Sequence, residues 1–327
     1  MNEFRTVFNI PDFPEQITYR KKSLFTGSCF TEYIGKLMKD HKFPVLVNPF
    51  GVIYNPVSAG KGLELLMGQI ELGKNDYLNF NGLWHSFYHH SRFSNPDKEK
   101  FLAGILDGLE KSRQFLENSR FLIITFGTAF VYRYKKTGKI VSNCHKIPTV
   151  EFQREMLGIE GIINYYHNLL NRLFELNPQL NIVFTVSPVR HLKDGAIDNQ
   201  ASKATLILSV RELCKSFKNA LYFPAYEIVM DDLRDYRFYD EDMVHPNSQA
   251  IKYIYRLFSE SLISPDDIKI SKEINKIRKA FTHRPFNKKS PQFHQFVENN
   301  LNKISSMKAK LPFLDFSEEE DYFKNFS

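Results

Sequence analysis

The sequence has little cysteine and tryptophan, and it lacks a long apolar run. Among 327 residues there are three cysteines and one tryptophan. Cys29, Cys144 and Cys214 form no Cys-x-x-Cys pair and no even set, which favours a reducing compartment over a disulfide framework. No apolar run reaches the roughly 18 residues of a membrane-spanning helix, and the first residues lack the apolar core of a secretory leader. We therefore expect a cytoplasmic protein with no membrane span.

The charge is moderately basic but is not organised for nucleic acid. The chain carries 44 Lys and Arg against 37 Asp and Glu, for a net charge of +7. No long basic block is interleaved with stacking aromatics, so we expect no nucleic-acid partner, and a basic tail that binds nucleic acid ranks last among the hypotheses. A hydrophobic fraction of 43% supports a real core.

Short apolar runs alternate with longer amphipathic segments along most of the chain. The apolar runs predict strands at 23–26, 43–47, 121–126, 182–186 and 221–223. The amphipathic segments predict helices at 32–41, 56–66, 98–116, 159–176, 202–217 and 249–262. This alternation predicts an α/β fold of flavodoxin type: a three-layer α/β/α sandwich around a central, mostly parallel, five-stranded sheet.

We expect this sheet and its helices to form one domain over residues 20–263, followed by a C-terminal extension over 264–327. Two insertions interrupt the alternation. Residues 75–95 are rich in histidine and aromatics and are expected to form a lid, and residues 131–155 are expected to form a hairpin that turns at 136–138. In the extension, an isoleucine stripe predicts a helix that packs on the core, and the last 15 or so residues are expected to be loose.

Polar residues follow each predicted strand. Ligands bind beyond the carboxyl ends of the strands in an open parallel sheet, so these residues should converge on one edge. The segments are Gly27-Ser28-Cys29, Asn48 to Gly51, Gly127-Thr128, Ser187 to His191, and Asp242 to His245.

A serine, a histidine and an aspartate among these segments suit nucleophilic catalysis. A hydroxyl becomes a good nucleophile when a histidine, oriented by a carboxylate, takes its proton. Ser28 is the candidate nucleophile, His245 the base and Asp242 the orienting acid. Alternatives remain: Ser28 could simply cap the following helix, and Cys29 could be the nucleophile or a buried apolar residue. Two neighbours of Asp242 are rival acids, namely Asp240 and Glu241.

Longer blocks of sequence resemble one family. Gly27-Ser28-Cys29-Phe30 is similar to the name-giving motif of the GSCFA family, which belongs to the SGNH (GDSL-like) hydrolase superfamily. Further matching blocks are NPFGVIYNP (48–56), TFGTAFVY (125–132), NCHK (143–146), FTVSPVRHLKDG (184–195), NQASKA (199–204) and YFPAYEIVMDDLRDYRFYDEDMVHP (222–246).

The resemblance implies an α/β/α fold and metal-free ester hydrolysis or acyl transfer. It assigns the nucleophile to Ser28 and the Asp-x-x-His pair to Asp242 and His245. It also implies an oxyanion hole in which Gly51 supplies an amide. The third superfamily block carries Gly-x-Asn, whereas this chain has Gly127-Thr128-Ala129, so Thr128 or Asn143 is expected to replace the asparagine.

Other polar residues have weaker assignments. Arg190 and His191 either pack the strand end or bind an anionic or sugar-like acyl donor. His85 and His89 have helical ligand spacing but no acidic or cysteine partner nearby, so no metal site and no cofactor are expected. The expected substrate is a small-molecule or glycan-like acyl ester. The alternatives to a serine esterase are an acyltransferase on the same site and a binding protein on a hydrolase scaffold.

Overall fold

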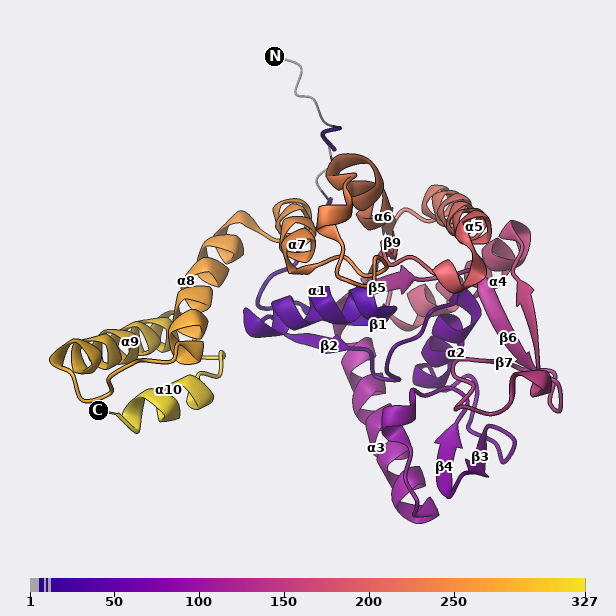
Figure 1. Ribbon diagram of the computed structural model, residues 1–327, viewed down its shortest axis with the longest axis horizontal. Coiled ribbons are helices and arrows are strands. Elements are labelled where there is room, and N and C mark those ends of the chain that lie inside the picture. The colour runs from indigo at the N-terminus through magenta and orange to yellow at the C-terminus, as the bar shows by residue number, and fades with distance from the viewer. Residues whose placement is uncertain (1–5, 9, 11–12, 327) are drawn as a thin grey trace.

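Five parallel strands form the central sheet. The computed structural model describes residues 6–8, 10 and 13–326, and Figure 1 shows the sheet at the centre of its main body. The strands are β1 (Lys22–Gly27), β2 (Val45–Val47), β5 (Ser119–Phe126), β9 (Asn181–Val186) and β10 (Ala220–Tyr222). All four pairings are parallel, and the order across the sheet is β10-β9-β5-β1-β2. The predicted fold class and the five predicted strands are confirmed.

The strand side chains alternate between two separate cores. Successive residues of a strand point to opposite faces of its sheet. Phe25 and Ile123 therefore lie in one buried cluster, whereas Leu24 and Ile124 lie in the other. Both faces are apolar, as expected for a parallel sheet that is covered on both sides.

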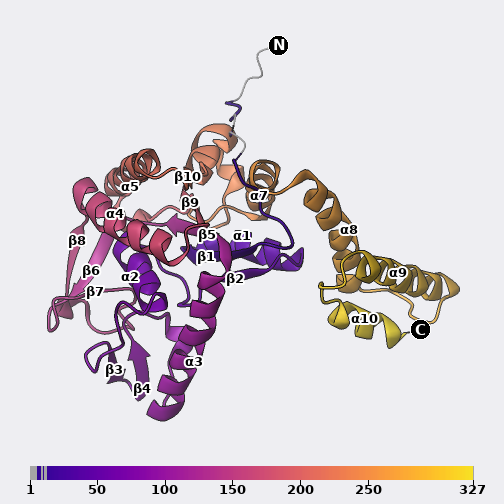
Figure 2. The ribbon, with the colours of Figure 1, turned by 180° about the vertical axis from the view of Figure 1, so that it is seen from behind.

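Helices cover both faces and give the three layers. Side chains of α1 (Cys29–Asp40) and α7 (Ser248–Leu262) pack in the cluster that contains Phe25. Side chains of four other helices pack in the cluster that contains Leu24, namely α2 (Pro56–Leu66), α3 (Lys98–Glu117), α4 (Ile159–Leu176) and α5 (Ala196–Ser216). A short helix, α6 (Ala225–Glu227), follows β10. Figure 2 shows the same layers from behind. The predicted helix bounds agree with the structure to within one residue, except that α1 begins three residues and α5 six residues earlier than expected.

The two insertions form small antiparallel sheets beside the main one. β3 (Tyr77–Phe80) pairs with β4 (Leu83–Ser86), and β6 (Phe130–Tyr134) lies between β7 (Ile140–Val141) and β8 (Phe152–Met156). The hairpin predicted within 131–155 is therefore confirmed. Residues 75–95 line none of the pocket described below, so the lid expected from them is wrong; residues of the 131–155 insertion line it instead.

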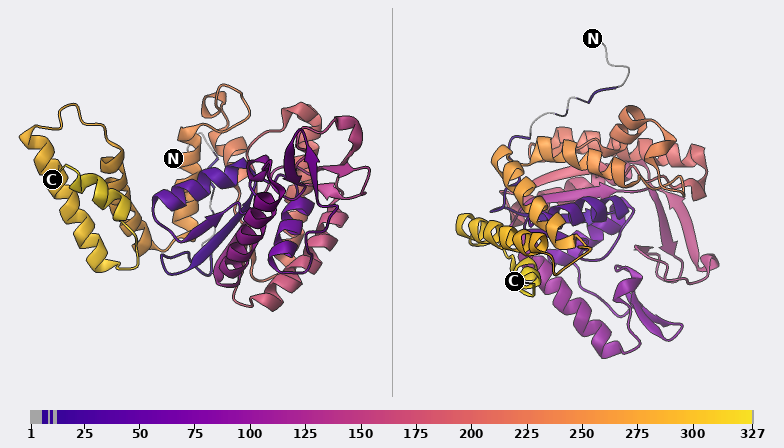
Figure 3. Two further views of the ribbon diagram at one scale, coloured as in Figure 1. Left: turned by 90° about the horizontal axis from the view of Figure 1, so that it is seen from below. Right: turned by 60° about the vertical axis from the view of Figure 1, so that its left-hand side comes forward.

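Three helices form the C-terminal extension, on one side of the main body in Figures 1 and 3. They are α8 (Pro265–Thr282), α9 (Pro291–Lys310) and α10 (Ser317–Lys324). Ile274 and Ile277 of the predicted stripe are buried. The expectation of a loose end is wrong, because α10 is ordered with Phe323 buried, and its buried Glu319 accepts a hydrogen bond from Lys42 at 2.9 Å. Within the described residues, no helix is both long and apolar enough to cross a membrane.

Candidate active site

The site lies where the strand order of the sheet reverses. Counting only the strands of the central sheet, the chain order across it is 2-1-3-4-5, so the connections after β1 and β5 leave in opposite directions. This switch point opens a crevice outside the carboxyl ends of the strands. Ser28 follows β1 and Gly127 follows β5, and the two are in contact: a Cβ added to Gly127 would lie 3.4 Å from Ser28 Cβ.

The turn before Ser28 depends on glycine. Gly27 has φ +141°, and a Cβ at this position would lie 2.2 Å from the carbonyl oxygen of Thr125. Its N–H donates to Asn48 Oδ1 at 2.9 Å, which fixes the turn against the end of β2. A side chain at position 27 would therefore clash with β5 and displace Ser28.

Ser28 occupies the N-cap position of α1, but its side chain does not cap the helix. The residue is 1% exposed, and its Oγ has no hydrogen-bond partner among the described residues. Buried hydroxyls are normally hydrogen-bonded. The hydroxyl is therefore not used by the fold, which weakens the simple capping interpretation.

Asp242 and His245 form a hydrogen-bonded pair on the loop before α7. His245 Nδ1 lies 2.6 Å from Asp242 Oδ2, and Asp242 Oδ1 accepts the backbone N–H groups of Val244 and His245, each at 2.9 Å. The backbone bond from His245, and then its side-chain bond, lower the pKa of Asp242 to about 2. Asp242 is therefore ionised at neutral pH and positions the imidazole, whose Nε2 makes no hydrogen bond to any described residue.

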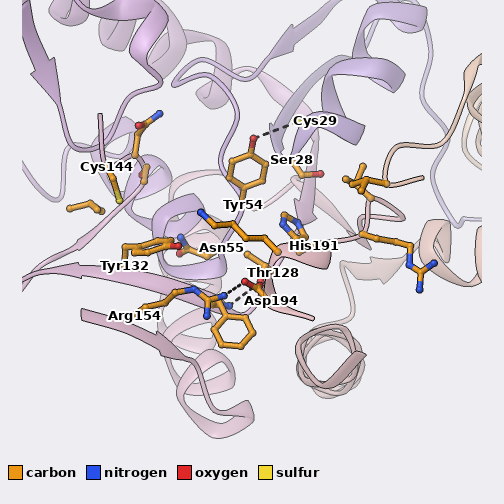
Figure 4. Close-up of a pocket in the computed structure, with 18 of the residues that line it drawn as sticks. Ser28, Cys29, Tyr54, Asn55, Thr128, Tyr132, Cys144, Arg154, His191 and Asp194 are labelled. Atoms are coloured by element: carbon orange, nitrogen blue, oxygen red, sulfur yellow. Dashed lines mark hydrogen bonds and ion pairs between the residues drawn. The ribbon is translucent and has the colours of Figure 1, made fainter. Parts of the chain in front are cut away.

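Ser28 and His245 line the same pocket, a cavity of about 410 Å³ (Figure 4). The walls include Tyr54 and Asn55, which immediately precede α2, and Tyr132 from β6. Arg154 closes one side: it forms an ion pair with Asp194, and its guanidinium carbon lies 3.9 Å from the ring centroid of Phe130. Ser28 and His245 form no direct hydrogen bond in this structure.

Several other predicted site residues also line this pocket, namely Cys29, Thr128, Asn143, Arg190 and His191. The Thr128 hydroxyl forms a hydrogen bond with Ser202 Oγ at 3.1 Å, and Asn143 Oδ1 accepts a hydrogen bond from the backbone N–H of His145 at 2.8 Å. Cys29 Sγ lies 3.6 Å from the Tyr54 hydroxyl, and burial raises the pKa of its thiol. The thiol is therefore protonated at neutral pH.

Three predicted residues do not line the pocket: Asp242, which holds His245, Gly127, which lies beside Ser28, and Gly51. The Gly51 N–H donates to the carbonyl of Asn48 at 2.8 Å, and a Cβ at this position would lie 2.3 Å from Cβ of His90. The amide of Gly51 is therefore engaged in a tight turn. Gly127 adjoins Ser28, but its N–H donates to the Tyr54 carbonyl at 2.7 Å.

The residues near the site that were not predicted from the sequence include Tyr54, Asn55, Arg154 and Lys203. Lys203 is fully buried in α5, and its Nζ donates to the carbonyls of Gly127 at 2.6 Å and Ser187 at 2.7 Å. Burial lowers its pKa to about 7. A lysine within an apolar helical pattern is the signal that could have identified it, since unpaired lysine is rarely buried.

The histidines considered as metal ligands are engaged elsewhere. His85 Nδ1 lies 2.6 Å from Ser94 Oγ, and His89 Nδ1 lies 2.8 Å from Ser86 Oγ. Across the described part of the chain, no group of three or more His, Cys, Asp or Glu residues is arranged to hold a metal ion.

The parallel sheet, with helices on both faces and polar strand ends at its switch point, defines an α/β/α protein of flavodoxin-like strand order. Residues 22–258 match the model of the GSCFA family, and residues 274–326 match that of the GSCFA domain protein, C-terminal domain. The chain belongs to the GSCFA family, as its sequence motifs predicted.

Three similar solved structures have low sequence identity to this chain. A carbohydrate esterase family 3 from Talaromyces cellulolyticus is 12% identical over 77% of this chain and 99% of its own, with a TM-score of 0.32. An acetyl esterase mutant with acetate ion is 15% identical over 78% and 99%, with a TM-score of 0.33. A Clostridium thermocellum family 3 carbohydrate esterase is 13% identical over 77% and 97%, with a TM-score of 0.31. No curated protein matches the chain in sequence.

Proposed function

We propose that this protein is a serine hydrolase that cleaves an acyl ester through Ser28, His245 and Asp242. One observation carries the proposal: the unused hydroxyl of Ser28 shares a pocket with a histidine whose Nδ1 is held by a carboxylate. A nucleophile, a base and an orienting acid are the elements of a catalytic triad, on whatever fold they occur.

The mechanism follows from the roles of these three residues. Ser28 Oγ attacks the ester carbonyl while His245 Nε2 takes the hydroxyl proton, and Asp242 stabilises the imidazolium that forms. The imidazolium then protonates the leaving alcohol, which leaves an acyl group on Ser28. A water molecule, deprotonated by His245, attacks this acyl-enzyme and releases the acid, and Ser28 regains its proton.

The first turn of α1 supplies one group for the developing oxyanion. The N–H of Cys29, the first residue of α1, has no main-chain acceptor among the described residues, as is usual for the first amides of a helix. Donors placed this way stabilise the negative oxygen of the tetrahedral intermediate. The pocket beyond Ser28 has room for a small acyl ester or a single sugar unit.

An acyltransferase would use the same acyl-enzyme with an alcohol in place of water. A binding protein is the second candidate of a different class, and the missing Ser28–His245 hydrogen bond favours it. Catalytic hydrogen bonds are often long in unliganded sites and tighten only around substrate, so this gap does not decide against catalysis.

Hydrolysis of p-nitrophenyl acetate tests the proposal. We expect a burst of p-nitrophenol and a transient mass gain of one acetyl group on the peptide that contains Ser28. Both signals should be absent in Ser28→Ala and persist in Ser317→Ala, a serine of the C-terminal extension far along the chain from the site. Adding glycerol or a simple sugar as acceptor separates transfer from hydrolysis. If folded wild-type protein is not acetylated, the hypothesis of a binding protein is favoured instead.

A further inference from the structure

His191 presents a buried nitrogen to the site without a partner. The residue follows β9, and its backbone N–H is fixed by Asn199 Oδ1 at 2.8 Å. Its ring stands edge-on to Tyr54, with centroids 5.7 Å apart, and Figure 4 shows it beside Ser28 and Thr128. Its Nε2 is buried with no hydrogen-bond partner in the described chain. Such a group is costly unless something absent from the structure satisfies it.

This nitrogen and the Ser28 side chain converge on the same point. A Cβ added to Gly127 would lie 3.4 Å from His191 Nε2 and 3.4 Å from Ser28 Cβ. The Ser28 side chain and His191 Nε2 therefore lie on two sides of the bare Cα of one glycine, with the Tyr54 carbonyl oxygen 3.1 Å from the same Cβ position. Ser28 Oγ and His191 Nε2 are both buried without a hydrogen-bond partner among the described residues.

The end of β5, by contrast, offers no free donor. The N–H groups of Gly127 and Thr128 both donate to the Tyr54 carbonyl, at 2.7 and 3.0 Å, and that of Ala129 donates to Ser202 Oγ at 2.7 Å. Ala129 itself stands where the Gly-x-Asn pattern has its asparagine side chain. The corner beside Ser28 consequently lacks an amide donor from this strand.

His191 is suited to donate rather than to accept a proton. Burial, and then the positive charges that Lys203, His245 and Arg154 carry when protonated, lower its pKa to about 4, so the ring is neutral and keeps one N–H. Among the described residues, no carboxylate forms a hydrogen bond or ion pair with its ring, whereas His245 is held by Asp242. The two histidines therefore have different surroundings. Those of His245 suit an acid–base group, and those of His191 suit a hydrogen-bond donor that keeps its proton.

We propose that His191 Nε2–H donates to the oxyanion formed when Ser28 attacks the substrate carbonyl, in place of the asparagine that this chain lacks. The inference rests on the proposed function. As the bond from Ser28 Oγ to the carbonyl carbon forms, the carbonyl electron pair moves to the oxygen and the hydroxyl proton moves to His245. His191 keeps its own proton throughout and hydrogen-bonds the negative oxygen.

Substitutions at position 191 test this role with p-nitrophenyl acetate. Removing one oxyanion donor costs about 10²–10³-fold in kcat with KM nearly unchanged. We expect that loss in His191→Phe and, should the larger ring prevent folding, in His191→Leu. His191→Gln retains an N–H donor of similar reach, so its kcat should be at least about tenfold higher than that of His191→Phe or His191→Leu. His294→Gln, on the exposed face of α9, is the matched control and should keep wild-type activity.

Three results would overturn the inference. The first is wild-type kcat in folded His191→Phe or His191→Leu, and the second is equal loss in the Gln and apolar variants. The third is a pH profile of kcat/KM that loses its acidic limb in His191→Gln. This result would mean that His191 is the base. These results differ from failure of the proposed function, in which Ser28→Ala would keep the activity or the wild type would show none.

Discussion

The Oδ2 atom of Asp242 lies 2.6 Å from Nδ1 of His245, while Oδ1 of the same carboxylate accepts the backbone N–H groups of Val244 and His245. One side chain thus shapes the loop and orients the ring. Asn at position 242 would keep an oxygen for the loop but place an N–H₂ donor against Nδ1, which would reverse the tautomer of His245.

We therefore predict that Asp242→Asn lowers kcat by about 10³–10⁴-fold with little change in KM or in folding. Asp240→Asn is the matched control, since Asp240 is a sequence rival on the same loop whose carboxylate makes no hydrogen bond to His245. Steady-state kinetics on p-nitrophenyl acetate measure both variants. Equal losses in the two variants would contradict the assignment of the acid.

Cys29→Ala should retain activity within about fivefold, because a thiol with a raised pKa remains protonated and is a poor nucleophile. For the same reason, iodoacetamide at pH 7 should modify Cys29 slowly and inhibit little. A loss in Cys29→Ala as large as that in Ser28→Ala would move the nucleophile to the cysteine.

Gly27→Ala should lower the free energy of unfolding by more than about 2 kcal/mol, because it combines a left-handed backbone with a clash against Thr125. Gly104→Ala, in exposed α3 where a Cβ meets no atom within 4 Å, should instead stabilise by about 0.5–1 kcal/mol. Urea denaturation compares the two. A Gly27 variant as stable as wild type would show that the turn tolerates a side chain.

Lys203 should give the stability a distinctive pH dependence. Its pKa in the folded protein is lowered to about 7 from the usual lysine value of 10.5, so between these values the unfolded chain holds more protons. This group alone then makes the free energy of unfolding rise with pH, by at most about 1.4 kcal/mol per pH unit. Its contribution is least favourable below pH 7, where the ammonium is buried and charged.

Lys203→Met removes that titration. The difference in unfolding free energy, wild type minus Lys203→Met, should increase by roughly 2 kcal/mol between about pH 7.5 and pH 9. Urea denaturation across this range provides the curves. Parallel curves for the two proteins would mean that the ammonium is not desolvated as the structure indicates.

The strands and helices of the main body could be predicted because their patterns are local. The run FLIITF, for example, has the length and continuous apolar character of a buried parallel strand, and it forms most of β5. The ordered α10 could not be predicted this way, because its sequence SEEEDYFK is highly charged. The helix is stabilised by contacts that Phe323 and Glu319 make with residues from distant parts of the chain, such as Lys42.

Part of the candidate site was predictable because its residues directly follow strands of the central sheet. Ser28, Gly127 and His191 each follow such a strand, so the sheet itself brings them together. Arg154 comes from β8, and its place in the pocket wall depends on how the 131–155 insertion folds back over the strand ends. Gly51 follows β2 as expected, but the local turn directs its amide to Asn48.

The most direct test of the central claim is labelling with a fluorophosphonate probe, with the modified residue mapped by mass spectrometry. The variants are wild type, Ser28→Ala, Cys29→Ala and His245→Ala, each checked for folding by circular dichroism. We predict a covalent adduct on Ser28 that forms in wild type and Cys29→Ala and is lost in the other two. No adduct on Ser28 in folded wild-type protein, or labelling that persists without His245, would contradict the account.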